Sequence, residues 1–62
     1  MPLTPKQLVK ILKQNGFEEI TQRGSHLKMK NPITNKTVIV PMHDKDLKKG
    51  TEQGILKDAG IK

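Results

Sequence analysis

The segment SHLKMKNPITNKTVIVP, residues 25–41, decides the fold, because it contains two short strand patterns separated by a turn pattern. Apolar and polar residues alternate through residues 25–30, and successive side chains of a strand point to opposite faces of a sheet. Leu27 and Met29 therefore share one face, which we expect to be buried. The polar residues share the opposite, exposed face; they are His26, Lys28 and Lys30. A register shift of one residue would bury these three polar groups and expose the two apolar ones.

The second half of this segment predicts a partner strand. Residues 31–36, NPITNK, are rich in the Asn, Pro and Thr residues that favour turns. Residues 37–41, TVIVP, are β-branched and end in a proline, with Val38 and Val40 on one face and Ile39 on the other. The short turn between the strands predicts that they pair antiparallel.

Helix signals precede the strands, in residues 4–16. Thr4 is a favourable N-cap, Pro5 suits the first helical position, and Gly16 can adopt the left-handed conformation just past the end. The residues expected on the buried face are Leu8, Val9, Ile11 and Leu12. A basic stripe on the opposite face consists of Lys6, Lys10 and Lys13. This stripe is either an ordinary solvated face or a surface that contacts phosphate.

A further strand and a second helix complete the pattern. Residues 17–23, FEEITQR, predict a strand, although alternation does not place Phe17 and Ile20 on one face. Near the C-terminus, helical spacing begins near Lys49, and Gly60 is placed to end the helix. The residues expected on its buried face are Thr51, Ile55, Leu56 and Ala59.

The predicted fold is α+β, in a single domain covering residues 1–62, with the order αβββα. Two amphipathic helices bury their apolar faces most economically by covering one face of a three-stranded antiparallel sheet. The same order of elements occurs in the double-stranded-RNA-binding domain. In this arrangement the other face of the sheet stays exposed, and it is the face that bears His26.

Composition restricts the kind of partner. Twelve Lys and Arg residues against six Asp and Glu residues give a formal net charge of +6. This balance favours a polyanion, with nucleic acid first and an acidic membrane surface second. The single aromatic residue, Phe17, argues against a stacking platform for single strands. The chain has no cysteine, no apolar run that could cross a bilayer and no signal-peptide pattern, so we expect a cytoplasmic protein without a membrane partner.

One histidine is a candidate for chemistry. The sequence has no cysteine nucleophile, phosphate-binding glycine loop or metal motif, so we expect no metal and no cofactor. His26 lies in a basic setting, and histidine transfers protons near neutral pH. Arg23 and Lys28 are suited to hold a phosphate, and Gly24 and Ser25 suit a tight turn beside it. From spacing alone, a surface histidine that begins a strand is the commoner interpretation, and a general base is the alternative.

Four segments together resemble the HicA family, the messenger-RNA interferase toxins of bacterial HicAB toxin–antitoxin modules. The segments are TPKQLVKILKQNGF (4–17), RGSHLKM (23–29), VIVPMH (38–43) and LKKGTEQGILKDAGI (47–61). They occur in the family's order and cover nearly the whole chain. The most recognisable parts are G-S-H at 24–26 and the K-G-T, I-L and A-G-I groups of the last segment.

The resemblance implies a fold like the double-stranded-RNA-binding domain and a metal-independent endoribonuclease that acts on messenger RNA. It also implies a type II toxin that a HicB-type antitoxin neutralises. Carried over by position, the catalytic histidine is His26, preceded by Gly24 and Ser25. His43 matches a recurrent family position, for which we expect a structural hydrogen bond and assign no catalytic role.

Three functions follow as hypotheses. In the first, His26 acts as general base on the RNA 2′-hydroxyl and then as general acid, supported by Arg23 and Lys28. The further residues expected to bind RNA are Lys6, Lys10, Lys13 and Lys30. The second is a non-catalytic double-stranded-RNA-binding module, and the third is an interaction protein whose basic face docks an acidic partner.

Overall fold

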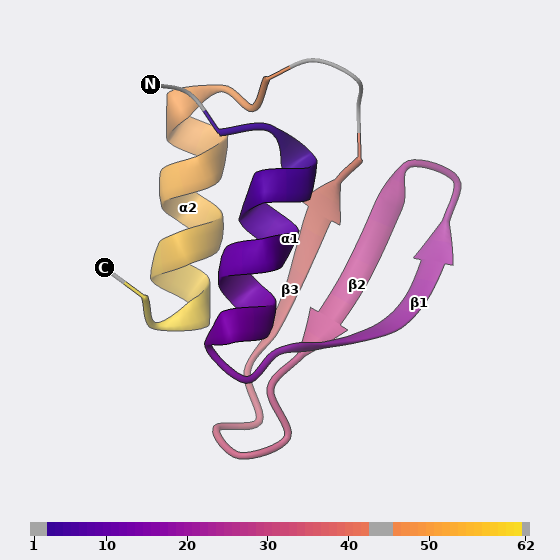
Figure 1. The fold of residues 1–62 in the computed structure, drawn as a ribbon, viewed down its shortest axis with the longest axis vertical. Coiled ribbons are helices and arrows are strands. Elements are labelled where there is room, and N and C mark those ends of the chain that lie inside the picture. The colour runs from indigo at the N-terminus through magenta and orange to yellow at the C-terminus, as the bar shows by residue number, and fades with distance from the viewer. Residues whose placement is uncertain (1–2, 43–45, 62) are drawn as a thin grey trace.

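The structure, a computed structural model, describes residues 3–42 and 46–61 and has the predicted order of elements (Figure 1). The elements are α1 (Pro5–Gln14), β1 (Glu18–Arg23), β2 (His26–Lys30), β3 (Thr37–Pro41) and α2 (Lys49–Ala59). The strands form one antiparallel sheet in the order β1-β2-β3. The α+β fold and its αβββα order are therefore confirmed.

Local signals at both ends fix the first helix. The Thr4 hydroxyl accepts a hydrogen bond from the Gln7 backbone N–H at 3.2 Å, and the Gln7 side chain accepts one from the Thr4 N–H at 2.9 Å. This reciprocal capping box satisfies donors that a helix start leaves free. At the other end Gly16 has a φ of 91°, and the Phe17 N–H bonds back to the Leu12 carbonyl at 3.0 Å. The predicted start and stop of α1 are confirmed.

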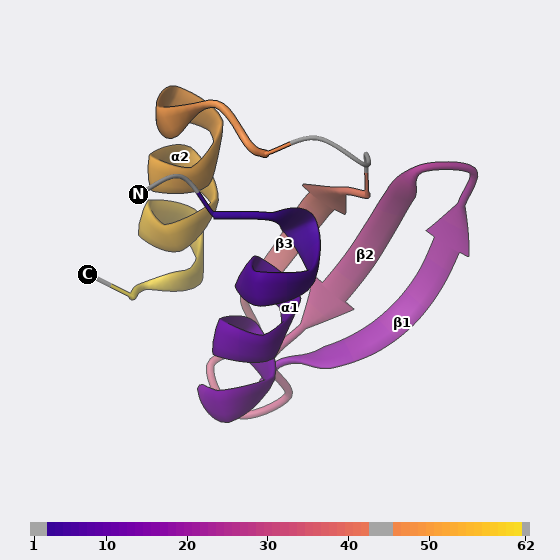
Figure 2. The ribbon, with the colours of Figure 1, turned by 45° about the horizontal axis from the view of Figure 1, so that its top comes forward.

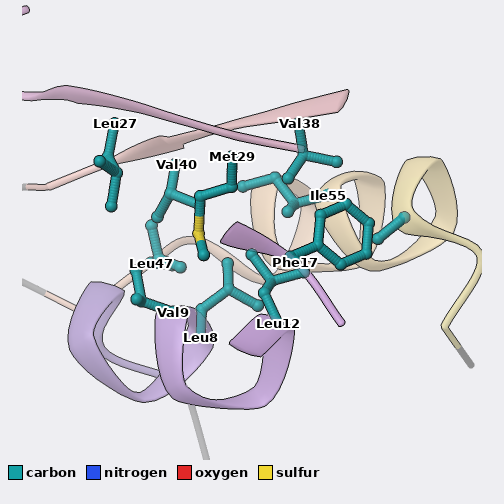
Figure 3. Close-up of a cluster of buried hydrophobic side chains, with 11 residues drawn as sticks. Leu8, Val9, Leu12, Phe17, Leu27, Met29, Val38, Val40, Leu47 and Ile55 are labelled. Carbon is teal, nitrogen blue, oxygen red and sulfur yellow. The ribbon is translucent and has the colours of Figure 1, made fainter. Parts of the chain in front are cut away.

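The core lies between the sheet and the two helices, both of which pack mainly against β3 (Figures 1 and 3). Its buried apolar residues are Leu8, Val9, Leu12, Phe17, Leu27, Met29, Val38, Val40, Leu47, Ile55 and Ala59. Alternation therefore predicted the inward side chains of β2 and β3 correctly. Ile39 points away from the core and is 54% exposed, also as predicted.

Four expectations about burial need correction. Ile11 is only half-buried, because α1 contacts the small sheet through a narrow arc centred on Leu8 and Leu12. Leu56 is also only half-buried, although it packs against the core. Thr51 is exposed: it lies in the first turn of α2, whereas the buried positions of this helix come in its later turns. Leu47 precedes α2 in a segment predicted to be only a connection, yet it is buried in the core.

A register shift in β1 explains why alternation did not assign its faces. Glu19 pairs with Met29 and Thr21 with Lys28, so Ile20 is an extra residue without a partner across the ladder. Ile20 is 54% exposed, like the rest of this edge strand, all of which is exposed.

Two hydrogen bonds join the N-terminal segment to the region where α2 begins. The Leu47 N–H donates to the Leu3 carbonyl at 2.8 Å, and the Leu3 N–H donates to the Glu52 carboxylate at 3.0 Å. Residues far apart in sequence thereby hold the start of α2 beside the start of α1. Both helices lie on one side of the sheet (Figure 1), and within the described residues no element covers its outer face.

Candidate active site

On the outer face of the sheet, His26 lies in the central strand, β2, and has one paired residue on each neighbouring strand. Strand pairing puts Arg23 of β1 opposite His26 on one side and Pro41 of β3 opposite it on the other. Side chains paired across an antiparallel ladder point to the same face of the sheet. His26 and Arg23 are both exposed, so an imidazole and a guanidinium stand side by side on a surface open to solvent.

The next row of the same face adds a second cation. Lys28 lies two residues along β2, with Thr21 opposite it on β1 and Ile39 opposite it on β3. The two rows enclose a shallow hollow of about 590 Å³. Its lining residues are Thr21, Arg23, His26, Lys28 and Ile39. Among the described residues that line it, two are cations and none is a carboxylate, which suits this part of the hollow to an anion.

The hollow lies beside the turn that joins β1 to β2. This end of the hairpin extends beyond both helices (Figures 1 and 2). Gly24 has a φ of 58°, and no described residue beyond its two chain neighbours has an atom within 4 Å of the place where a Cβ would stand. The Gln22 side-chain amide donates to the Gly24 carbonyl at 3.0 Å, and the Met42 N–H donates to the Ser25 carbonyl. Gly24 and Ser25 thus form the open tight turn that the sequence predicts.

Lys30 occupies the third row of the outer face. It is half-buried, with Glu18 opposite it on β1 and Thr37 opposite it on β3, and it does not line the hollow. Lys30 shares the face of His26 as predicted, but it stands two rows away and next to an acid.

The basic stripe of α1 is separated from His26 by the sheet. α1 packs its apolar arc on the inner face of the sheet (Figure 3), so its lysines and the imidazole lie on opposite sides of the sheet. The stripe borders its own hollow of about 470 Å³, lined by Lys6, Val9, Lys10, Lys13 and Gln14. Lys13 forms an ion pair with Glu19 of β1 at 2.6 Å, which leaves Lys6 and Lys10 as the stripe's more available cations.

Thr21 and Ile39 complete the hollow, and neither was among the site residues predicted from the sequence. Alternation had placed Ile39 on the outer face, which was an available signal, whereas the register shift in β1 hid the orientation of Thr21. His43 lies outside the described residues. Across residues 3–42 and 46–61, no three His, Asp or Glu side chains gather as metal ligands. None of the helices in this part of the chain is long and apolar enough to cross a membrane.

A sequence model of the HicA toxin, a toxin of bacterial toxin–antitoxin systems, matches residues 5–61. The chain belongs to the HicA toxin family. The resemblance inferred from the quoted segments is therefore confirmed over nearly the whole chain. No individually curated protein matches the sequence. Membership of this family gives the protein the role of a toxin and implies an antitoxin as its partner.

Proposed function

We propose that this HicA protein is a metal-independent endoribonuclease that cleaves messenger RNA in the cytoplasm and that a HicB-type antitoxin inhibits it. The observation that carries the proposal is the exposed His26 in a cationic hollow with Arg23 and Lys28, in a chain of a toxin family. The order of elements, which is that of the double-stranded-RNA-binding domain, supports RNA as the polyanion.

RNA brings its own nucleophile, so a single proton-transferring residue is sufficient for cleavage. His26 in its neutral form takes the proton of the 2′-hydroxyl, and the 2′-oxygen forms a bond to the adjacent phosphorus. The bond from phosphorus to the 5′-oxygen breaks, and the imidazolium returns its proton to that oxygen. The products are a 2′,3′-cyclic phosphate and a free 5′-hydroxyl, and His26 is neutral again.

Arg23 and Lys28 have the chemistry to bind the phosphate that is attacked. A guanidinium can donate two parallel hydrogen bonds to phosphate oxygens, and an ammonium adds a mobile point charge. Arg23 lies directly across from His26, and Lys28 lies in the next row. Both cations can therefore stabilise negative charge that grows on the phosphate oxygens during the reaction.

The remaining predicted RNA-binding residues act away from the cut. Lys30 extends the cationic outer face by one row beyond Lys28. Lys6, Lys10 and Lys13 lie across the sheet, so they contact only an RNA that is long or folded enough to reach around the molecule.

The decisive test is replacement of His26. We expect His26→Ala and His26→Gln to lower kcat by about 10²–10⁴-fold, the usual contribution of general acid–base catalysis, and to leave folding unchanged because the side chain is exposed. Cleavage of purified RNA is measured with and without a chelator, and melting temperatures report folding. Gln53→Ala, which changes an exposed side chain of α2, is the control and should cleave like the parent. A folded His26→Ala protein that degrades RNA at the parent's rate would show the assignment to be wrong.

The same assay separates the rival functions. A non-catalytic RNA-binding module would bind RNA with strong salt dependence and produce no cleavage products on long incubation. Cleavage that stops on addition of chelator would contradict the metal-independent mechanism. Cleavage that continues with the cognate antitoxin in excess would contradict inhibition by that partner.

A further inference from the structure

The outer face of the sheet carries an apolar side chain beside its charges, and the catalytic mechanism above leaves it without a role. Three large apolar side chains are exposed in the described part of the chain: Ile20, Ile33 and Ile39. Of these, Ile39 alone lines the hollow that contains His26. It is 54% exposed in the middle of β3, so a β-branched side chain faces solvent at the edge of a cationic site.

Strand register fixes where Ile39 stands relative to the reactive groups. It lies directly across from Lys28, and His26 is two residues before Lys28 on the same face. Paired side chains on adjacent strands are about 5 Å apart, and diagonal ones roughly 7–8 Å. Ile39 is therefore next to a phosphate-binding cation and diagonal to the proton acceptor. A nucleotide has a matching set of groups, because its phosphate, its 2′-hydroxyl and the flat apolar face of its base are only a few bonds apart.

We infer that Ile39 positions the nucleotide whose 2′-hydroxyl His26 deprotonates, by packing against the face of that nucleotide's base. This inference rests on the endoribonuclease function proposed above. With the phosphate held by Arg23 and Lys28, the base is directed over Ile39 at the β3 side of the hollow. An aliphatic side chain makes no hydrogen bond to a base edge, so the contact requires a base without selecting which one.

Ile39→Ser tests the contact, with Ile20→Ser as a matched control. Ile20 has the same 54% exposure and belongs to the same sheet but does not line the hollow. Two substrates are needed: a short RNA whose cut site has been mapped with the parent, and the same RNA with an abasic ribonucleotide on the 5′ side of the cut. Melting temperatures are measured for every variant, and Ile39→Leu tests whether another aliphatic side chain restores the rate.

On the RNA that carries the base, we expect Ile39→Ser to lower kcat/KM about tenfold, which corresponds to ~1.4 kcal/mol. On the abasic RNA, Ile39→Ser and the parent should cleave at the same rate, because the contact is already missing. Ile39→Leu should retain most activity, and Ile20→Ser should match the parent on both substrates. These substrate-dependent losses would not arise from a purely structural role, which would slow both cleavages equally.

Several outcomes would overturn the inference. An active parent with an equally active Ile39→Ser variant would refute the contact and leave the endoribonuclease intact. Equal losses on both substrates would mean that Ile39 acts on folding. Unchanged cleavage together with weaker inhibition by the antitoxin would assign Ile39 to the protein partner. A parent that cleaves neither RNA would contradict the proposed function, and with it this role.

Discussion

Among the described residues, Asn31 is the only polar side chain that is buried, at 6% exposure. Its carbonyl oxygen accepts hydrogen bonds from the Ile33 and Thr34 N–H groups at 2.9 and 3.2 Å. Its amide nitrogen donates to the Asn15 carbonyl at 3.1 Å. One side chain therefore shapes the turn between β2 and β3 and joins that turn to the end of α1.

These contacts predict the effect of two substitutions on stability. Asn31→Ala removes all three of these part-buried hydrogen bonds, so we expect the free energy of unfolding to fall by about 1–3 kcal/mol. Asn31→Asp retains the acceptor for the turn but replaces the donor to Asn15 by a second oxygen at a buried site, so we expect it also to be less stable than the parent. Urea denaturation of both variants measures the difference. Equal stability of Asn31→Ala and the parent would contradict the role given to this side chain.

At the scale of elements, α1 ends by geometry that requires glycine, whereas α2 contains a glycine that it does not need. Gly16 has a φ of 91°, and a Cβ there would stand 3.2 Å from the Asn31 amide nitrogen. Gly54 is exposed within α2, and apart from its chain neighbours and the backbone of α2 no described atom lies within 4 Å of its Cβ position. The same substitution should therefore have opposite effects at the two positions.

We expect Gly16→Ala to destabilise the fold by about 1–2 kcal/mol, because a side chain is strained in the left-handed region. Gly54→Ala should stabilise it by about 0.5–1 kcal/mol, because alanine is the better helix former. Denaturant midpoints of the two variants provide the comparison. Changes of the same sign at both positions would contradict the difference that the backbone geometry implies.

Across the whole molecule, the sheet separates two cationic surfaces: the hollow at His26 and the lysine stripe of α1. On the proposed function, a short RNA binds at the hollow with His26 and does not reach the stripe, whereas a long RNA can contact both surfaces. This separation predicts that the effect of the stripe on binding depends on the length of the RNA.

Lys10→Ala tests this prediction. It should leave the binding of a dinucleotide unchanged, because no contact is lost, and it should weaken the binding of a long RNA. For single-stranded RNA, the loss of one phosphate contact lowers the slope of log K against log salt by about 0.7. Lys57→Ala, which removes an exposed charge from α2, is the control. An equal effect of Lys10→Ala on short and long RNA would mean that the two surfaces act on the same nucleotides.

Most of the secondary structure was predictable, because its signals are local. The capping residues of α1 and the alternation around Leu27 act through neighbours in the sequence, and the structure confirms both. The burial of Leu47 was not predictable, since it depends on the contact of a connecting segment with the N-terminal residues. The orientation of Ile20 could not be predicted either, because a register shift depends on the pairing of two strands and not on the sequence of one.

For the candidate site, the sequence by itself determined the direction of each side chain along β2. A strand has a period of two residues, so His26 and Lys28 had to face away from the core once Leu27 and Met29 faced it. Only the tertiary structure decided which residues meet. The strand register places Thr21 and Ile39 in the hollow. Because α1 packs on the inner face of the sheet, its lysine stripe lies on the side of the sheet opposite His26. The physical reason is that side-chain direction follows from local backbone geometry, whereas proximity across strands and layers depends on contacts between residues distant in the sequence.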